Sequence, residues 1–271
     1  MERLIMNKIN LHAFVIPVYK ESPYLEDCII SLKSQTTQSN LIITTSTPTE
    51  QTKKIAKKYD IPYHIYNGNR QGIANDWNFS LSKTTAQYTT IAHQDDIYEP
   101  QFVENTLKKA TQKERQNLLI FTDYYDLVNG SVRKKSLNSF VKKILLLPFL
   151  IKSSHKNKWI KKSILLFGDP ICCPSVTFCK ENLEKFIFST NFKCALDWVA
   201  WLDLASMEGG FVFINKKLVK HRIHVASETT SMLQSGERKQ EELIIFKKIW
   251  GLKIGGFISW MYSIGHKDNF V

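Results

Sequence analysis

Short apolar segments rich in β-branched and aromatic residues alternate with amphipathic segments along the first half of the chain. The apolar segments predict strands, and the amphipathic segments, whose apolar residues recur every three or four positions, predict helices. Because this alternation builds a mostly parallel sheet with helices on both faces, we predict an α/β fold. The predicted strands are 13–18, 41–45, 63–66, 88–92 and 118–124, and the predicted helices are 25–32, 50–59, 72–83 and 101–110.

Two of these helices carry start signals in the sequence. Ser22 and Pro23 fit an N-cap followed by proline at the first helical position. The run Thr47-Pro48-Thr49-Glu50 fits a capping box that also has proline at the first position. These signals place a turn after each of the first two strands.

The second half of the chain is less regular. Segments 140–151 and 159–166 are basic and amphipathic, which predicts helices. Segments 175–179, 211–214 and 217–224 predict strands. Segments 197–207 and 240–258 predict helices, the first with an apolar stripe that includes Trp198 and Trp201.

The 271 residues include five cysteines and no CxxC pair. This usage argues against a disulfide framework and against a zinc site, and it favours reduced, mostly buried thiols. The first residues show no apolar signal-peptide core, and the longest apolar run, 144–151, is interrupted by Pro148 and is too short to span a bilayer. We therefore expect a cytoplasmic protein that is soluble or peripheral on the inner face of the membrane.

The net charge of +12 is unevenly distributed. No acidic residue lies between Asp126 and Asp169, whereas that stretch holds ten Lys and Arg residues. Such a block suits nucleic acid, an anionic membrane or a polyanionic substrate. Since leucines accompany the lysines in 140–151, the anionic membrane surface is the partner that the pattern favours.

Two adjacent carboxylates, Asp95 and Asp96, follow the predicted strand 88–92. Because burying an unpaired charge is costly, we expect both to lie outside the core. Ligands of open α/β sheets bind at the carboxyl ends of the strands, and Mg²⁺ and Mn²⁺ prefer carboxylates combined with phosphate oxygens. The alternative is an Asp-rich turn with no ligand.

Four segments occur in a characteristic order: Phe14 to Tyr19, His93 to Tyr98, Ala195 to Trp198, and His221 to His224 followed by Ser227 and Thr229. Together they resemble family 2 glycosyltransferases, which have the nucleotide-sugar-binding GT-A fold. The resemblance covers about residues 12–230. It implies a nucleotide-binding half over about 10–128 and an acceptor half over about 129–230, with the basic amphipathic helices inserted there, and it leaves 231–271 as a helical C-terminal appendage.

The resemblance also implies roles for individual residues. A Mn²⁺ or Mg²⁺ ion would be held by Asp95, Asp96 and His224, and Asp197 would be the catalytic base. The nucleotide-sugar would be bound by Pro17, Val18, Tyr19, Glu21, Ser46, Arg70, Asn78, Gln94 and Asp95.

Three positions depart from the family pattern. His93 stands where the metal motif usually has its first aspartate, and Thr44-Thr45-Ser46 replaces an acidic pair that contacts the base. Trp77 replaces the arginine before the helix asparagine, which leaves phosphate contact to Arg70 or to the basic block. These departures weaken the expectation of metal affinity and of uracil as the base.

Several of these residues also have structural readings. Asp197 could be a helix N-cap, with Asp203 as a weaker candidate for the base. Tyr19 could pack on the first helix. His221 and His224 lie three residues apart on a predicted strand, so we expect them on opposite faces, with at most one reaching the metal.

We therefore predict an inverting, metal-dependent transfer from a nucleotide-diphosphate sugar, preferably a UDP-sugar, to a saccharide acceptor. The resemblance and the basic block suggest a lipid-linked acceptor in bacterial surface-polysaccharide synthesis, and no nucleic-acid partner. One alternative is a nucleotidyltransferase, but the Gly-rich phosphate loop of such enzymes is absent after the first strand. Another is a non-enzymatic protein that binds membrane or nucleic acid, which leaves Asp95, Asp197 and His224 unexplained.

Overall fold

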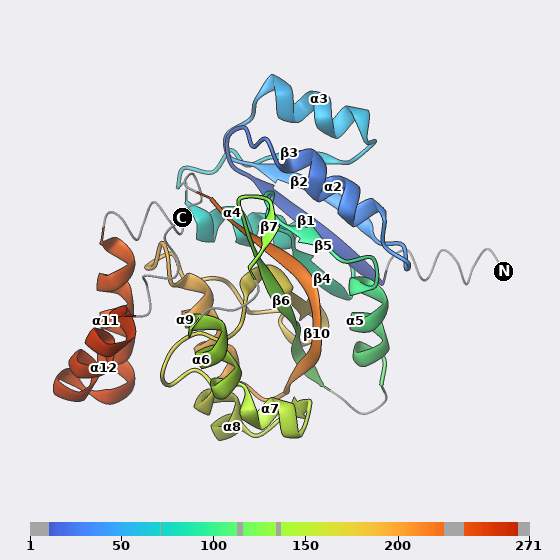
Figure 1. Ribbon diagram of the computed structural model, residues 1–271. Coiled ribbons are helices and arrows are strands. Elements are labelled where there is room, and N and C mark those ends of the chain that lie inside the picture. The colour runs from blue at the N-terminus through green and yellow to red at the C-terminus, as the bar shows by residue number, and fades with distance from the viewer. Residues whose placement is uncertain (1–10, 71, 113–115, 134–136, 225–235, 265–271) are drawn as a thin grey trace.

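A mixed, mostly parallel sheet with helices on both faces forms the centre of the molecule (Figure 1). The computed structural model describes residues 11–70, 72–112, 116–133, 137–224 and 236–264. The strands follow the order β3-β2-β1-β4-β9-β6-β10-β5, and two further short strands pair with β6 and β10. The predicted α/β fold is confirmed.

The first half of the sheet is parallel. It consists of β3 (Tyr63–Ile65), β2 (Asn40–Thr45), β1 (His12–Val18) and β4 (Tyr88–Ile91). Val18 pairs with Thr45, and Val15 pairs with Ile91. The carboxyl ends of β2, β1 and β4 therefore meet at one edge, where ligands of such sheets bind.

The second half of the sheet is partly antiparallel. β9 (Val176–Cys179) runs antiparallel to β4 and to β6 (Asn117–Val128), and β10 (Gly210–Ile223) runs parallel to β6. The two strands predicted over 211–214 and 217–224 are one strand, because β10 continues through register shifts after Ile214. The two-residue strands β5 (Ile97–Tyr98), β7 (Ser131–Val132) and β8 (Ser154–His155) were too short for the pattern to predict.

Alternate residues of the strands enter two hydrophobic cores. Phe14 and Ile16 of β1 pack with α2 (Leu25–Lys33), α3 (Glu50–Lys58) and α5 (Phe102–Ala110) on one face. Val15 faces the other core, which contains Trp77 of α4 (Ile73–Ser82) and Trp198 of α9 (Leu196–Ser206). Burial on both faces explains why the strands are apolar runs rather than alternating patterns.

For both predicted helix starts the N-cap lies two residues after the position that the sequence signals, since Thr49 and not Thr47 caps α3. Thr49 is the N-cap of α3, and its hydroxyl accepts a hydrogen bond of 3.1 Å from the Thr52 N–H. Ser22 is not the N-cap of α2, because that position belongs to Tyr24. The Ser22 hydroxyl instead donates to Asp95, so the residue contributes to the polar edge of the sheet.

The basic insertion folds into α6 (Leu137–Leu145), α7 (Leu147–Ile151) and α8 (Lys158–Ser163). Pro148 lies at the start of α7, which explains why the predicted helix 140–151 is divided. Two of the basic side chains point into the fold. Lys142 donates to the Tyr124 hydroxyl at 2.9 Å, and fully buried Lys161 donates to the Met207 and Gly209 carbonyls at 2.7 Å.

The predicted helix 240–258 is two helices, α11 (Glu237–Trp250) and α12 (Leu252–Ile264), which pack side by side (Figure 1). Gly251 divides them with a φ of +78°, a conformation that glycine adopts without steric cost. Ile245 and Phe246 of α11 belong to the same core as Trp198. The segment predicted as an appendage therefore shares the core of the sheet.

No helix in the described part of the chain combines the length and the apolar character needed to cross a bilayer.

Candidate active site

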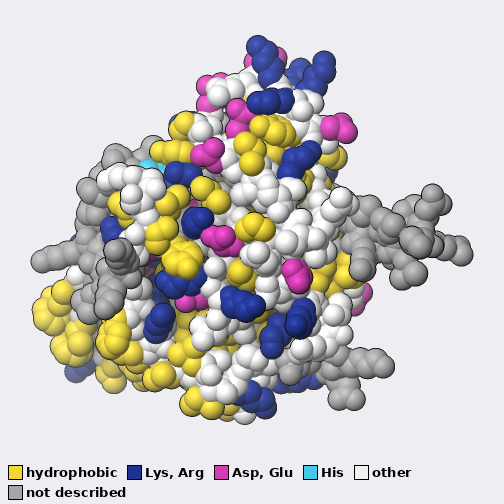
Figure 2. All heavy atoms as spheres, turned by 45° about the vertical axis from the view of Figure 1, so that its right-hand side comes forward, with side chains coloured by type: hydrophobic (Ala, Val, Ile, Leu, Met, Phe, Trp, Pro, Cys, Tyr) yellow, Lys and Arg dark blue, Asp and Glu magenta, His cyan; other side chains and the backbone are white. Residues whose placement is uncertain are grey.

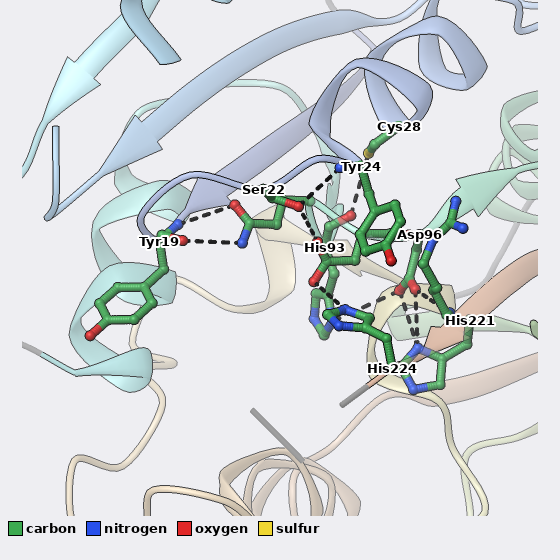
Figure 3. Close-up of polar contacts among 11 residues, drawn as sticks. Tyr19, Ser22, Tyr24, Cys28, His93, Asp96, His221 and His224 are labelled. Carbon is green, nitrogen blue, oxygen red and sulfur yellow. Dashed lines mark hydrogen bonds and ion pairs between the residues drawn. The ribbon is translucent and has the colours of Figure 1, made fainter. Parts of the chain in front are cut away.

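The turn after β4 brings the predicted metal residues together with the end of β10 (Figure 3). The Asp96 N–H donates to the His93 carbonyl at 3.2 Å, which tightens the four residues 93–96 into a turn. Since β4 lies beside β1, this turn stands next to the segment that follows β1. The sequence placed Asp95 and Asp96 at this edge, and the structure agrees.

Asp96 is a buried carboxylate, with 1% of its surface exposed. Its Oδ1 accepts from the Arg222 N–H at 2.8 Å and lies 3.1 Å from Nδ1 of His221. Burial opposes ionisation, but the His221 charge and hydrogen bond, with the Arg222 N–H, hold the pKa of Asp96 below its ordinary value. The expectation that both carboxylates lie outside the core is wrong for Asp96, because these partners compensate the buried charge.

Asp95 is less buried than Asp96 and faces a different set of partners. The Ser22 hydroxyl donates to its Oδ1 at 2.5 Å, and Nε2 of His224 lies 3.3 Å from its Oδ2. Asp95 is thus held between the segment after β1 and the segment after β10. Asp95 therefore faces the polar edge of the sheet, while Asp96 binds the end of β10, where the two histidines lie.

His221 and His224 both contact the aspartate pair, His221 at Asp96 and His224 at Asp95. The expectation that they point to opposite faces fails because β10 ends at Ile223. His224 lies beyond the pleated strand, so the alternation of side chains does not reach it. Burial lowers the pKa of His221, but the charge and hydrogen bond of Asp96 outweigh burial and leave that pKa raised.

The donor set fits a divalent ion that is completed by a ligand. Nε2 of His93 is buried without a hydrogen-bond partner, and buried Nε2 of His224 contacts Oδ2 of Asp95 at 3.3 Å without forming a hydrogen bond. Within the described residues, no group of three or more His, Cys, Asp or Glu side chains is arranged to hold a metal by itself. Mg²⁺ and Mn²⁺ are commonly held by one or two carboxylates together with substrate phosphates, so Asp95 with His224 meets the minimum. Both oxygens of Asp96 face His221, which makes it an anchor in this arrangement.

Arg222 is a part of the site that the sequence reasoning did not assign. Its Nε donates to the Asp95 carbonyl at 2.8 Å, and its guanidinium lies 4.1 Å from the centre of the Tyr24 ring. The Tyr24 ring also lies 5.0 Å from the imidazole of His224. The signal was present, because Arg222 lies within the segment 221–224 that carried the resemblance.

Tyr19 and Gln94 hold each other at the end of β1. The Tyr19 N–H donates to Oε1 of Gln94 at 3.3 Å, and Nε2 of Gln94 donates to the Tyr19 carbonyl at 3.2 Å. With these two hydrogen bonds in place, Tyr19 is 48% exposed. The ring is therefore presented at the surface and is not packed on the first helix.

Ser46 and Asp76 form a polar pair at the end of β2. The Ser46 hydroxyl donates to Oδ2 of Asp76 at 3.1 Å, while Oδ1 of Asp76 is buried without a hydrogen-bond partner. Burial raises the pKa of the Asp76 carboxyl. Asp76, from the first turn of α4, thus places a carboxyl group at the end of β2, where the sequence has Thr44-Thr45-Ser46 and no acidic pair. This position of Asp76 is visible only in the three-dimensional structure.

The remaining predicted nucleotide residues lie apart from these contacts. Asn78 uses both ends of its amide on Phe188, donating to its carbonyl at 3.0 Å and accepting from its N–H at 2.8 Å. Glu21 and Arg70 are exposed, Val18 is buried in the core and Pro17 is partly buried. Asn78 therefore holds the loop before α9 through its two hydrogen bonds with Phe188.

Asp197 lies in the first turn of α9, and the N-cap is Ala195, so the N-cap reading of Asp197 is wrong. Its Oδ1 accepts from the Trp198 N–H at 2.9 Å. Burial raises the pKa of Asp197, although the Arg238 charge opposes the rise, and burial with the Asp197 charge raises the pKa of Asp169 still further. Asp203 is exposed. A partly buried carboxylate with a raised pKa is suited to accept a proton.

Comparison with protein families matches residues 13–182 of the chain to the family described as Glycosyl transferase family 2. An uncharacterised glycosyltransferase of Rickettsia typhi is 23% identical over 236 residues, which cover 84% of this chain and 68% of the relative. The match to the family spans β1 through β9 and includes the turn at Asp95.

Solved structures share the fold at low identity. Residues 1–349 of Staphylococcus aureus TarS, in complex with UDP-GlcNAc, align with a TM-score of 0.63 at 15% identity, covering 95% of this chain and 72% of that fragment. The mannosyltransferase PcManGT of Pyrobaculum calidifontis, in complex with GDP-Man and Mn²⁺, aligns with a TM-score of 0.64 at 12% identity, covering 96% of this chain and 76% of that enzyme. These similarities show that the chain has the GT-A fold.

Proposed function

Because the chain belongs to glycosyl transferase family 2 and is a glycosyltransferase, we propose that it is an inverting, metal-dependent enzyme that transfers a sugar from a nucleotide-diphosphate donor to a saccharide acceptor. The observation that carries the proposal is the position of Asp95. It lies between Ser22 and His224 at the carboxyl edge of the sheet, and the preceding residue, Gln94, binds the backbone of exposed Tyr19. That edge is where a nucleotide-sugar binds in an open α/β sheet.

Asp95 and His224 would hold the divalent ion, with Asp96 and Arg222 fixing their positions. When bound, Mn²⁺ or Mg²⁺ supplies positive charge that stabilises the departing nucleoside diphosphate. Asp96 fixes the end of β10 through the Arg222 N–H, and Arg222 in turn binds the Asp95 carbonyl. These contacts join the turn after β4 to the strand that carries both histidines.

Asp197 would act as the general base. In an inverting displacement it removes the proton from the acceptor hydroxyl while that oxygen forms the new bond at the anomeric carbon and the nucleoside diphosphate departs. Since the carboxylate must be ionised to accept the proton, the rate should rise as pH increases through the pKa of Asp197. Because the pKa of Asp197 is raised, this increase in rate should occur at a higher pH than it would with an ordinary aspartate as the base.

The donor would lie along the ends of β1 and β2, with Tyr19 against the base. Asp76 supplies an unpartnered buried carboxyl oxygen at this end, which suits a hydrogen-bond donor on the base. TarS is seen with UDP-GlcNAc, whereas PcManGT is seen with GDP-Man. We favour a UDP-sugar, and a base-dependent competition assay tests this choice.

The acceptor side would face a membrane, consistent with a lipid-linked saccharide acceptor in surface-polysaccharide synthesis at the inner face of the cell membrane. Exposed Lys143 and Lys152 accompany exposed Ile151 and Trp159 on the insertion. In Figure 1 the insertion lies at the bottom of the molecule and α12 at its lower left. Figure 2 shows apolar and basic side chains along that lower edge. Lysines mixed with apolar side chains suit an anionic lipid surface.

Hydrolysis of a panel of nucleotide-sugars in the presence of Mn²⁺ tests the proposed function. We expect the wild-type chain to release nucleoside diphosphate from one donor, with a rate that falls when the ion is removed by chelation. A nucleotidyltransferase would instead consume a nucleoside triphosphate and release pyrophosphate. A non-enzymatic protein that binds membrane or nucleic acid would leave every donor intact.

A further inference from the structure

A single carboxylate of the C-terminal hairpin holds the backbone that leads into the base helix α9. Glu241 of α11 accepts hydrogen bonds from three successive N–H groups, those of Lys193 at 2.7 Å and of Cys194 and Ala195 at 2.9 Å. The N-cap of α9 is Ala195, which offers no side-chain cap. The negative charge of Glu241 therefore takes the place that a capping side chain would fill at the positive end of the helix dipole.

The same hairpin also fixes the residue that follows Asp197. The Trp198 indole N–H donates to the Leu165 carbonyl at 3.0 Å. Its ring lies edge-to-face on Phe246 of α11, with centroids 4.9 Å apart, and 6.0 Å from the Tyr262 ring of α12. The backbone before Asp197 and the side chain after it are thus both held by α11 and α12.

The face of α11 that carries Glu241 also supplies charge near the base. Arg238, one turn earlier, donates from Nε to Glu242 at 2.9 Å, and Glu242 is 2% exposed. Among the charged groups that lower the pKa of Asp197, Arg238 has the largest effect. Because residues three and four apart share a helix face, Arg238, Glu241 and Glu242 are presented together.

We propose that Glu241 is a positioning residue for the general base, since by binding the N–H groups of residues 193–195 it fixes the segment that presents Asp197. The inference rests on the role of Asp197 in the proposed function. It makes the C-terminal hairpin, which lies outside the residues matched by the family, a working part of the active site. The competing explanation is that Glu241 is only a helix cap that adds stability.

Hydrogen exchange tests the contact of Glu241 with the N–H groups of residues 193–195 independently of activity. In Glu241→Ala we expect faster amide exchange over residues 193–199, with little change in the turn at 93–96. Lys193→Gln is the matched control, because it removes the ion pair of Lys193 with Glu237 but keeps the N–H that Glu241 accepts. Unchanged exchange over 193–199 in Glu241→Ala would overturn the proposal.

Kinetics distinguish positioning from simple capping. For hydrolysis of a UDP-sugar with Mn²⁺, Glu241→Ala should lower kcat about tenfold or more, because small misplacements of a catalytic group can cost up to about 10²-fold. The affinity for UDP should stay within about twofold. Glu241→Gln keeps one of the two acceptor oxygens, so it should recover part of kcat.

The decisive measurement is the double variant Asp197→Asn with Glu241→Ala. If Glu241 acts through Asp197, its loss should lower kcat no further once the base has gone, since residues that act as a unit are non-additive. The melting temperature should still fall in both backgrounds. Multiplied losses of kcat, or an unchanged kcat in Glu241→Ala despite faster exchange, would show that Glu241 only caps the helix.

Failure of the proposed function gives a different result. If Asp197→Asn hydrolyses the donor at the wild-type rate, Asp197 is not the base and the positioning role falls with it, whatever the exchange data show. If Asp197→Asn is slow but Glu241→Ala is not, the proposed function stands and only the positioning role is wrong.

Discussion

The two proposed parts of the site, a metal edge at Asp95 and a base edge at Asp197, are constructed in opposite ways. At the metal edge, Asp95 and Asp96 follow β4 and the two histidines lie at the end of β10, so strands of one sheet set their positions. At the base edge, Asp197 lies in a helix that is held from α11, more than 40 residues further along the chain. The first edge depends on the sheet, whereas the second depends on packing between distant helices.

The largest effect should come from Asp95. We expect Asp95→Ala to abolish transfer and the metal-dependent part of donor binding, because the remaining imidazole cannot hold the ion with the diphosphate alone. Its stability should fall little, since Asp95 is only partly buried. Near wild-type turnover with Mn²⁺ would show that the metal edge is elsewhere.

Asp197→Asn should come next. Loss of a general base typically lowers the rate by about 10²- to 10⁴-fold, and the acidic limb of the pH–rate profile should disappear with it. Affinity for UDP should remain, because the contact concerns the acceptor. A variant that loses UDP binding but keeps its rate at saturation would show that Asp197 belongs to the nucleotide site. The distinction between a metal edge and a base edge would then be wrong.

Asp96 provides a comparison within the metal edge, because the proposal gives Asp95 a role in metal binding and Asp96 a structural role. Asp96→Ala leaves the Arg222 N–H and His221 without their buried partner, which typically costs about 3–5 kcal/mol. At about 2–4 °C for each kcal/mol in a chain of this size, the melting temperature should fall by about 6–20 °C. Calorimetry on Asp95→Ala provides the control, and equal losses for the two variants would contradict the division of roles.

The sequence located Asp95 and Asp96 at the carboxyl edge of the sheet but missed the tertiary contacts that hold the site, for a physical reason. Asp95 follows a strand whose apolar pattern is local, so its edge could be inferred from the order of strands, whereas His224 was assigned only through the resemblance to the family. Arg222 and Asp76 were missed because their partners, the Asp95 carbonyl and Ser46, lie far away in sequence. Glu241 had no local signal, since its acceptor role depends on how α11 packs on α9.

The same limit explains other errors along the chain. Ser22 and Pro23 have the local form of a helix start, but the hydroxyl of Ser22 is engaged by Asp95. Lys142 and Lys161 count toward the basic block in the sequence, yet they bind Tyr124 and backbone carbonyls inside the fold. Tertiary contacts decided each of these positions.

The smallest expected effect concerns the lipid surface. Changing Lys143, Lys152 and Lys156 to Gln should weaken sedimentation with anionic vesicles at low salt, by roughly 1 kcal/mol for each cation near the surface. Donor hydrolysis should be unchanged, because these exposed side chains lie outside both edges.

The vesicle experiment has its own controls. Vesicles of neutral lipid should capture much less of the wild-type chain, and rising salt should release it from anionic vesicles. A further variant, Trp260→Ser on α12, tests the apolar part of the contact, since the Trp260 side chain is exposed. Equal capture by neutral and anionic vesicles would refute a charge-driven contact.

Calorimetric titration of UDP with and without Mn²⁺ tests the central claim most directly. The wild-type chain should bind UDP more tightly with Mn²⁺ than in a chelator, and Asp95→Ala should lose this gain while keeping the metal-free affinity. Equal affinities of the wild-type chain in both conditions, or an undiminished gain in Asp95→Ala, would contradict a metal site at the end of β4.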